Sequence, residues 1–232
     1  MILEDWHTHN KMCHHAVGSI EDYVKKAIKR KLRTIGISDH FPYEILRNSS
    51  VSIEEVPYQE YSMSLNEVDF YISSIQNLKE KYKNKIQLRI AFEVDYFKNQ
   101  ERFLNLQLNN NLDNLDYILG SVHILHKNSK LFAFDDRRFL SMYKEYDSID
   151  NIYLNYYHKL QDMVASEEFD FDVVSHFDLP KKYNKRFIDK DLVMNEAIKT
   201  LEFVKKRDLT MEINTGGLRK EIKEQYPSFE II

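Results

Sequence analysis

The sequence of 232 residues predicts an α/β fold in which parallel β-strands alternate with α-helices. Two observations lead to this prediction. Short β-branched runs alternate with stretches of helical periodicity, and residues able to do chemistry follow most of the predicted strands. Because parallel strands are joined by crossover connections, this order implies a parallel sheet with helices outside it. We find no tandem repeat, low-complexity tract or linker, so a single domain over residues 1–232 is expected.

The composition is typical of a folded protein of a reducing compartment. Hydrophobic residues make up 43% of the chain and aromatic residues 13%, which is ample for a sizeable core. The formal net charge is −4 and no basic block occurs, which argues against a nucleic-acid partner. A single cysteine, Cys13, excludes an internal disulfide framework. With neither a signal sequence nor an apolar run near the ~20 residues that span a bilayer, we expect a cytoplasmic protein without a membrane partner.

The first half of the chain contains two helices and the first strands. The apolar opening, residues 1–3, leads directly into a His-x-His motif. A capping-box pattern at residues 19–22, with Asp in place of Glu, predicts the start of a helix. The β-branched run at residues 34–38 predicts a buried strand, and residues 41–60, with two prolines and a Ser/Asn cluster, predict a long loop. Apolar residues between 65 and 82 then follow helical spacing.

The second half repeats the same alternation. The pattern predicts strands over residues 86–94, 117–122, 171–175 and 209–213, and helices over residues 103–108, 152–165 and 191–206. A polar loop is expected after residue 123. Counting the opening strand, this makes six strand–helix units in sequence.

Histidines and carboxylates stand where five of these strands end. These residues are His7 and His9, Asp39 and His40, Glu93, His123, and His176. In an extended segment, residues two apart point to one face, so two imidazoles of the His-x-His motif would converge as half of a metal site. In a barrel, the carboxyl ends of the strands carry the site. The sequence therefore predicts a metal centre, which His15 would also reach, whereas His14, His126 and His158 are expected outside it.

Taken together, these motifs resemble the PHP (polymerase and histidinol phosphatase) superfamily, from residue 5 to the C-terminus. The closer likeness is to its histidinol-phosphate phosphatase branch. The stretches that carry it are Cys13-His14-His15-Ala16, Gly120-Ser121-Val122-His123, His176-Phe177-Asp178-Leu179-Pro180-Lys181-Lys182, Glu212-Ile213-Asn214-Thr215-Gly216-Gly217-Leu218-Arg219, and Tyr226-Pro227-Ser228.

The resemblance implies a distorted, TIM-like (β/α)7 barrel that holds up to three divalent metal ions, commonly zinc, manganese or iron. Carried over by position, His7 and His9 would bind one metal ion and His123 a second. Glu93 would bridge these two ions, and this group would be catalytic. The third ion would be bound by His15, His40 and His176. Asp5 and Asp39, beside ligands, would orient imidazoles.

The reaction implied is hydrolysis of the phosphate monoester L-histidinol phosphate to L-histidinol and phosphate, a late step of histidine biosynthesis. Clustered cations lower the pKa of a bound water, so that hydroxide can attack in line. Arg219, Lys181 and Lys182 are candidate phosphate contacts, with solvated surface cations as the alternative interpretation. Tyr43 and Tyr58 are candidate walls of an imidazole pocket, and ordinary packing is their alternative.

The last motif of the family, an Asp-x-His at the end of a seventh strand, does not occur after His176. If this sequence is complete, we expect a barrel that lacks its last strand and helix, with an open edge. The metal ions held by His7, His9 and His123 would then each lack a ligand. The His15, His40 and His176 site would keep its full set, and catalytic activity would be in question.

Three other functions are left open by the residues. The first is another PHP-type phosphoesterase, acting on a different small phosphate or on nucleic-acid ends. The second is a metal-dependent hydrolase of the wider amidohydrolase type, although no strand-end lysine is evident to bridge its metals. The third is a non-catalytic relative that binds metal or a partner. The native metal, the preferred ester and the oligomeric state are not indicated by the sequence.

Overall fold

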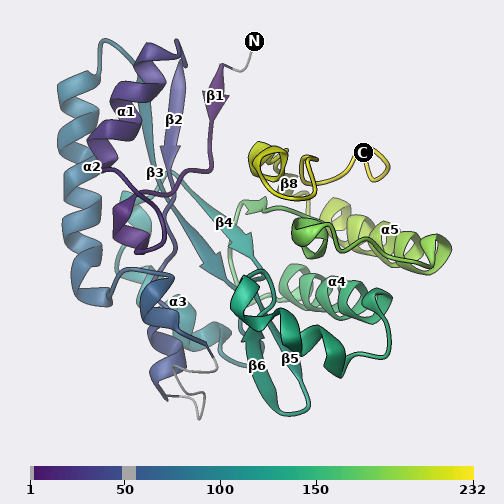
Figure 1. The fold of residues 1–232 in the computed structure, drawn as a ribbon. Coiled ribbons are helices and arrows are strands. Elements are labelled where there is room, and N and C mark those ends of the chain that lie inside the picture. Colours follow the sequence, from purple (N-terminus) through teal and green to yellow (C-terminus); the bar gives the residue numbers. More distant parts are fainter. Residues whose placement is uncertain (1–2, 49–55) are drawn as a thin grey trace. The chain divides into compact units, whose positions relative to one another are not determined.

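The computed structural model describes residues 3–48 and 56–232, and Figure 1 shows their strands and helices. The chain divides into two compact units. Unit 1 comprises Met1–Asp95 and Arg102–Leu119, and unit 2 comprises Tyr96–Glu101 and Gly120–Ile232. Within the described ranges, no helix is both long enough and apolar enough to cross a membrane.

Unit 1 is built on parallel strands covered by helices. Its strands are β1 (Glu4–Asp5), β2 (Thr34–Ile37), β3 (Gln87–Asp95) and the first residues of β4 (Tyr117–Ser121). β2 pairs in parallel with both β1 and β3 and is buried along its whole length. Its helices are α1 (Ile20–Lys29), α2 (Val68–Tyr82) and most of α3 (Glu101–Asn109). α1 contacts β2 and α2 contacts β3, and the two helices run beside these strands in Figure 1.

The start of α1 confirms the capping pattern read from the sequence. The Ser19 hydroxyl accepts a hydrogen bond from the Asp22 N–H (3.2 Å), and the Asp22 carboxylate accepts one from the Ser19 N–H (2.8 Å). An aspartate therefore completes the capping box in place of the usual glutamate. The helix orients its buried residues Ile20, Val24 and Ala27 toward the strands.

Asp116, just before β4, joins β3, β4 and α2. Its carboxylate accepts hydrogen bonds from the Ile90 N–H (2.7 Å), Lys79 Nζ (2.9 Å) and Arg89 Nη1 (2.8 Å). Burial alone would raise the pKa of Asp116, but these donors hold the pKa below its usual value. Because the pKa of Asp116 is lower in the folded state than in the unfolded state, its ionised carboxylate stabilises the folded state above about pH 4. This contribution to the free energy of unfolding is lost as the pH falls below that value.

We therefore expect Asp116→Asn to lower the urea midpoint of unfolding at pH 7 and to have little effect at pH 3. The neighbouring Asp113→Asn, at an exposed position, serves as the control and should change neither midpoint. An equal loss of stability at both pH values would show that the charge of Asp116 does not matter.

Unit 2 contains the end of β4, the short strands β7 (Val173–Val174) and β8 (Thr210–Met211), and a separate hairpin. The helices α4 (Ile149–Ala165) and α5 (Lys190–Lys206) pack against each other, as Figure 1 shows. β7 pairs in parallel with β8. Over the described residues, the strand order β1-β2-β3-β4-β7-β8 confirms the predicted α/β class.

The hairpin corrects the prediction of a polar loop after residue 123. β5 (Ile124–Lys127) and β6 (Lys130–Ala133) pair in antiparallel fashion. Asn128 and Ser129 between them both have positive φ, 49° and 62°, which is the backbone of a tight hairpin turn. The prediction was wrong because this turn is made by Asn-Ser instead of the glycine-containing pairs that mark such turns.

The loop predicted at residues 41–60 lies partly outside the described residues, which omit 49–55. Its described parts form the short 3-10 helices Glu44–Asn48 and Tyr58–Glu60.

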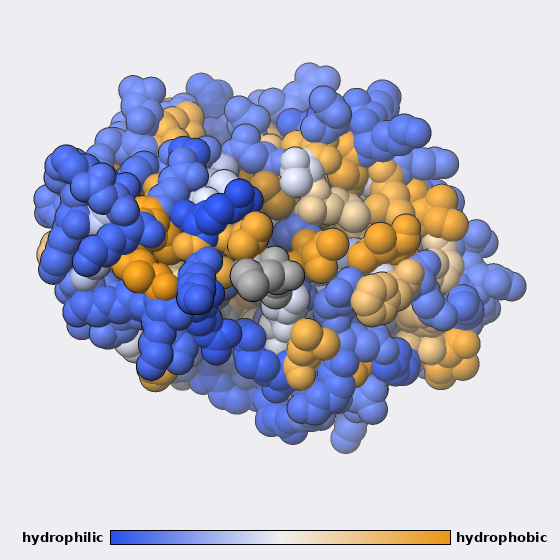
Figure 2. Space-filling model, turned by 90° about the horizontal axis from the view of Figure 1, so that it is seen from above, coloured by the Kyte–Doolittle hydropathy of each residue, from blue (hydrophilic) through white to orange (hydrophobic). Residues whose placement is uncertain are grey.

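On the face seen in Figure 2, hydrophilic residues form most of the outline and hydrophobic residues are interspersed between them. Several large apolar side chains of unit 2 are exposed: Ile188, Leu192, Ile198, Phe203, Ile213, Leu218, Phe229 and Ile232.

Candidate metal centre

The His-x-His segment follows β1 and is fastened to β2 by its middle residue. Thr8 N–H donates to Ser38 Oγ (3.0 Å), and Thr8 Oγ1 donates to the Gly36 carbonyl (2.7 Å). Thr8 is thereby buried against β2. Its neighbours in an extended backbone point to the opposite side. His7 and His9 accordingly converge, with their Nε2 atoms 3.1 Å apart.

The absence of a side chain at Gly36 allows a second contact that holds the His-x-His segment. A Cβ atom at this position would collide with the Tyr117 hydroxyl and with the Trp6 carbonyl oxygen. In its absence, the Tyr117 hydroxyl donates a hydrogen bond to the Trp6 carbonyl, and the two rings pack edge to face with centroids 5.4 Å apart. The residue before His7 is therefore held in place by a side chain from β4.

Glu93 lies at the centre of the histidine cluster of unit 1. Its Oε2 atom is 3.0 Å from His7 Nε2, 3.1 Å from His9 Nε2 and 3.4 Å from His40 Nδ1. Only 1% of the Glu93 side chain is exposed, whereas the His9 side chain retains 23%. A buried carboxylate requires positive partners, and three imidazoles converge on this one.

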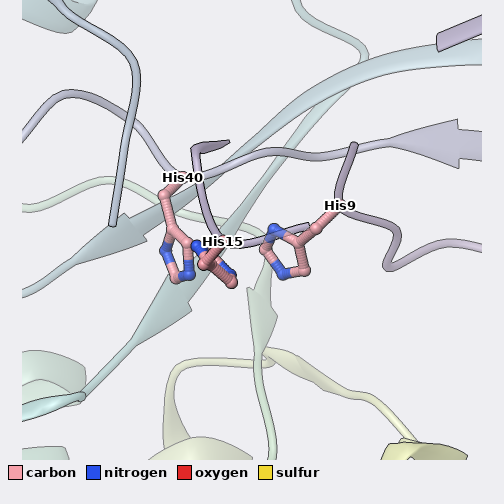
Figure 3. Close-up of side chains that lie close together, drawn as sticks. All are labelled: His9, His15 and His40. Atoms are coloured by element: carbon pink, nitrogen blue, oxygen red, sulfur yellow. The ribbon is translucent and has the colours of Figure 1, made fainter. Parts of the chain in front are cut away.

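His15 completes a second group with His9 and His40. Ring centroids are 4.7 Å apart for His9 and His40, 5.4 Å for His9 and His15, and 5.2 Å for His15 and His40. Figure 3 shows the three rings turned toward a common space. Nitrogen atoms of all three lie within 4.8 Å of one another. His15 is placed by the 3-10 helix Lys11–Cys13, and its Nδ1 lies 2.9 Å from the Cys13 carbonyl.

Asp39 and Asp5 contact the backbone in and beside the His-x-His segment. The Asp39 carboxylate accepts hydrogen bonds from the N–H (2.7 Å) and the side-chain amide of Asn10, the residue after His9. Burial raises the pKa of Asp39 to about 6, although the charge of His9 and the Asn10 N–H lower it. Asp5 is exposed and accepts a hydrogen bond from the His7 N–H (3.4 Å). Both carboxylates thus help to position the His-x-His segment.

Asp95 is a site residue that the sequence analysis missed. It stands two residues after Glu93 on β3 and is 5% exposed. Its carboxylate accepts a hydrogen bond from the Tyr43 hydroxyl, and its Oδ2 lies 3.9 Å from His40 Nδ1. Tyr43, expected as a possible pocket wall, is buried and lies against the His40 ring, with centroids 5.9 Å apart. The period-2 rule that paired His7 with His9 would have found Asp95.

The donor set of unit 1 fits a divalent metal ion. Imidazole nitrogen and carboxylate oxygen are the ligands of zinc and of related transition metals. The Nδ1 atom of His9 is buried and makes no hydrogen bond to any described residue. Two Nε2 atoms and one carboxylate oxygen, mutually about 3 Å apart, require protons or a cation among them. The cluster is therefore suited to bind a cation.

Unit 2 holds its own pair of predicted ligands, His123 and His176. Their ring centroids are 4.7 Å apart and their planes are inclined at 64°. The backbone of His176 is fixed on both sides, because its N–H donates to Glu212 Oε1 (2.7 Å) and its carbonyl accepts from the Tyr156 hydroxyl (2.9 Å). Glu212, like Asp95, was not predicted as a site residue. Both histidines are less than 10% exposed.

The three predicted phosphate contacts differ in their surroundings. Lys181 is 4% exposed, and its ammonium group contacts Asp178 (2.7 Å) and donates to the Gln225 carbonyl (2.7 Å). This lysine fastens the 3-10 helix Leu179–Tyr183 to the chain near residue 225. The ammonium group of Lys182 donates to Asp135 (2.8 Å), and Arg219 is exposed at the end of the 3-10 helix Thr215–Arg219.

The remaining histidines lie apart from these groups. His14 Nδ1 is 2.6 Å from the Gln59 carbonyl and its ring is exposed. His158, on α4, lies 3.3 Å from Glu196 and is 60% exposed. His126 was predicted in a loop but is an exposed residue of β5.

Histidines and a buried carboxylate at the carboxyl ends of parallel strands define an α/β protein with a candidate metal centre. The PHP domain family matches residues 5–216, most of the chain. The chain therefore belongs to the PHP domain family, as the motifs of its sequence predicted.

Three similar proteins extend this result. A probable histidinol-phosphatase of Deinococcus radiodurans is 29% identical over 99% of this chain and 80% of its own length. A crystal structure from Listeria monocytogenes, assigned to the histidinol phosphatases, covers 98% of this chain and 88% of its own with 26% identity and a TM-score of 0.89. The histidinol phosphate phosphatase of Lactococcus lactis, solved with zinc, L-histidinol and phosphate, covers 96% of this chain and 77% of its own. At 19% identity and a TM-score of 0.71, it supports the fold.

Proposed function

We propose that this protein is a metal-dependent phosphomonoesterase that hydrolyses L-histidinol phosphate to L-histidinol and phosphate, a step of histidine biosynthesis. The observation that carries the proposal is the convergence of three imidazoles on the buried carboxylate of Glu93. Membership of the PHP family and the similarity to a probable histidinol-phosphatase over nearly the whole chain favour this substrate.

The proposed metal ligands lie in both units. In unit 1 they are His7, His9, His15, His40 and Glu93, and in unit 2 they are His123 and His176. The distances within each unit and the family motifs support this assignment. We propose up to three divalent ions, with zinc first and manganese or iron as the alternatives. Asp5 and Asp39 would support the first ligands by holding the backbone of the segment that carries them.

Bound divalent ions would neutralise the phosphate and lower the pKa of a water molecule toward neutrality. The protein's own part is to hold the ligands rigidly. Glu93 supplies negative charge that no imidazole can, and its burial keeps that charge directed at the cluster. Lys182 and Arg219 are the proposed phosphate contacts, whereas Lys181 is only 4% exposed and its ammonium group is surrounded by acceptors of Asp178, Gln225 and Glu224. The positive charges of Lys182 and Arg219 would attract the anionic phosphate group of the substrate.

The test is phosphate release from L-histidinol phosphate by purified protein whose metal content is measured. We expect turnover with kcat/KM of roughly 10⁴ M⁻¹ s⁻¹ or more, within the ordinary range of enzymes. Other phosphomonoesters and a short 5′-phosphorylated oligonucleotide, assayed in parallel, should be poorer substrates. Faster release from one of these would favour a different phosphoesterase of the same family. Full metal content without turnover on any ester would favour a non-catalytic relative.

A further inference from the structure

A largely buried pair of opposite charges in unit 2 joins Lys182, the last residue of one of the family stretches, to Asp135, which none of these stretches includes. Asp135 follows β6, where the Phe134 N–H donates to the His123 carbonyl (3.2 Å). Lys182 Nζ donates both to the Asp135 carbonyl (2.7 Å) and to its Oδ2 (2.8 Å). The Tyr183 hydroxyl donates to the same carbonyl (2.6 Å). Lys182 and Tyr183 thus both hold Asp135, which lies in the segment after the hairpin.

The electrostatics of Asp135 and Lys182 agree with their pairing. Burial alone would raise the pKa of Asp135, but the charges of Lys182, His123 and His176 lower it to about 2. Burial lowers the pKa of Lys182, yet Asp135 raises it to a net value above the usual one. Both groups are therefore charged at neutral pH, with side chains less than a fifth exposed.

We propose that Asp135 is a positioning residue that holds the Lys182 ammonium in place to bind the phosphate group of the substrate. This rests on the proposed phosphatase function. Two of the three N–H donors of Lys182 are taken by Asp135, which orients the ammonium and leaves one donor for a ligand. Asp135 itself, being negative, would act through Lys182 rather than touch the phosphate.

The experiment compares Asp135→Asn, Lys182→Gln and the double variant in the metal-loaded protein, using histidinol phosphate as substrate and inorganic phosphate as a competing ligand. We expect each single change to raise KM and the inhibition constant of phosphate about tenfold, with kcat and metal content changed much less. Because Asp135 acts through Lys182, the double variant should be no worse than Lys182→Gln alone.

Asp162→Asn is the matched control. Asp162, on α4, forms an ion pair with Lys98 (2.8 Å) and is not among the charges that act on Lys182, so its replacement should leave KM unchanged. Additive effects in the double variant, or metal loss that accounts for the activity lost in Asp135→Asn, would overturn the proposal. Phosphate binding is also measured by calorimetry, so that a failure of this proposal can be distinguished from a failure of the proposed phosphatase function. Wild-type protein that binds phosphate through these residues but turns over no histidinol phosphate would contradict the function alone.

Discussion

Replacing Glu93 by glutamine is expected to lower kcat/KM for histidinol phosphate about 10³-fold, or about 4 kcal/mol of transition-state stabilisation. The substitution keeps the shape of the side chain but removes the charge on which His7, His9 and His40 converge at 3.0–3.4 Å. A neutral amide is a poor ligand beside imidazoles and offsets no cationic charge. Metal content per chain, measured by elemental analysis, should fall together with activity.

Glu196→Gln provides the control for loss of a buried carboxylate. Glu196 is 8% exposed on α5 and accepts hydrogen bonds from Gln161 (2.7 Å) and Lys199 (3.0 Å). Its replacement should lower the melting temperature slightly and leave kcat/KM and metal content as they are. If Glu93→Gln retained both full metal content and full turnover, Glu93 would not be a ligand and the proposed mechanism would fail.

Removing metal with a strong chelator is expected to abolish turnover and to lower the apparent melting temperature. Ligand binding at about a thousandfold excess over the dissociation constant stabilises the folded state by roughly 4 kcal/mol, which for a chain of this length corresponds to about 10 °C. Without a cation, the carboxylate and imidazoles of unit 1 would depend on protons alone. Differential scanning calorimetry with and without chelator, followed by added Zn²⁺, measures the effect and its reversal.

The variant His7→Asn/His9→Asn distinguishes metal loss from other effects of the chelator. With two proposed ligands removed, its melting temperature should respond less to chelation than that of the wild type. A melting temperature unaffected by chelation in the wild type, in protein shown to have lost its metal, would mean that the ions contribute nothing to folding. Turnover that persists in metal-free protein would contradict a metal-dependent reaction.

Much of the fold could be predicted because local patterns and tertiary structure agree. The alternation of β-branched runs and helical periodicities predicted the order of strands and helices, and the capping box located the start of α1 at Ser19. The convergence of His7 and His9 also followed from local geometry, since residues two apart share one face of an extended chain. These features depend on residues that are close together in the sequence, so a single sequence is enough to predict them.

The features that were missed depend on contacts distant in sequence. Asp135 and Lys182 are 47 residues apart, and their pairing requires a hairpin whose turn lacks glycine. The engagement of Lys181 by the Gln225 carbonyl is likewise invisible locally, and a buried lysine looks the same in sequence as an exposed one. Asp95 is different, because the periodicity of β3 would have indicated it beside Glu93.

The contact between Gly36 and Tyr117 has a consequence for how this chain can diverge. The glycine leaves room for the tyrosine ring, and the tyrosine hydroxyl in turn holds the carbonyl of Trp6, one residue before the first proposed ligand. A side chain gained at position 36 would displace that hydroxyl, and a smaller residue at position 117 would leave a void over β2. Either change alone would disturb the segment that precedes His7. We therefore expect positions 36 and 117 to vary together in evolution, although neither residue is a proposed ligand.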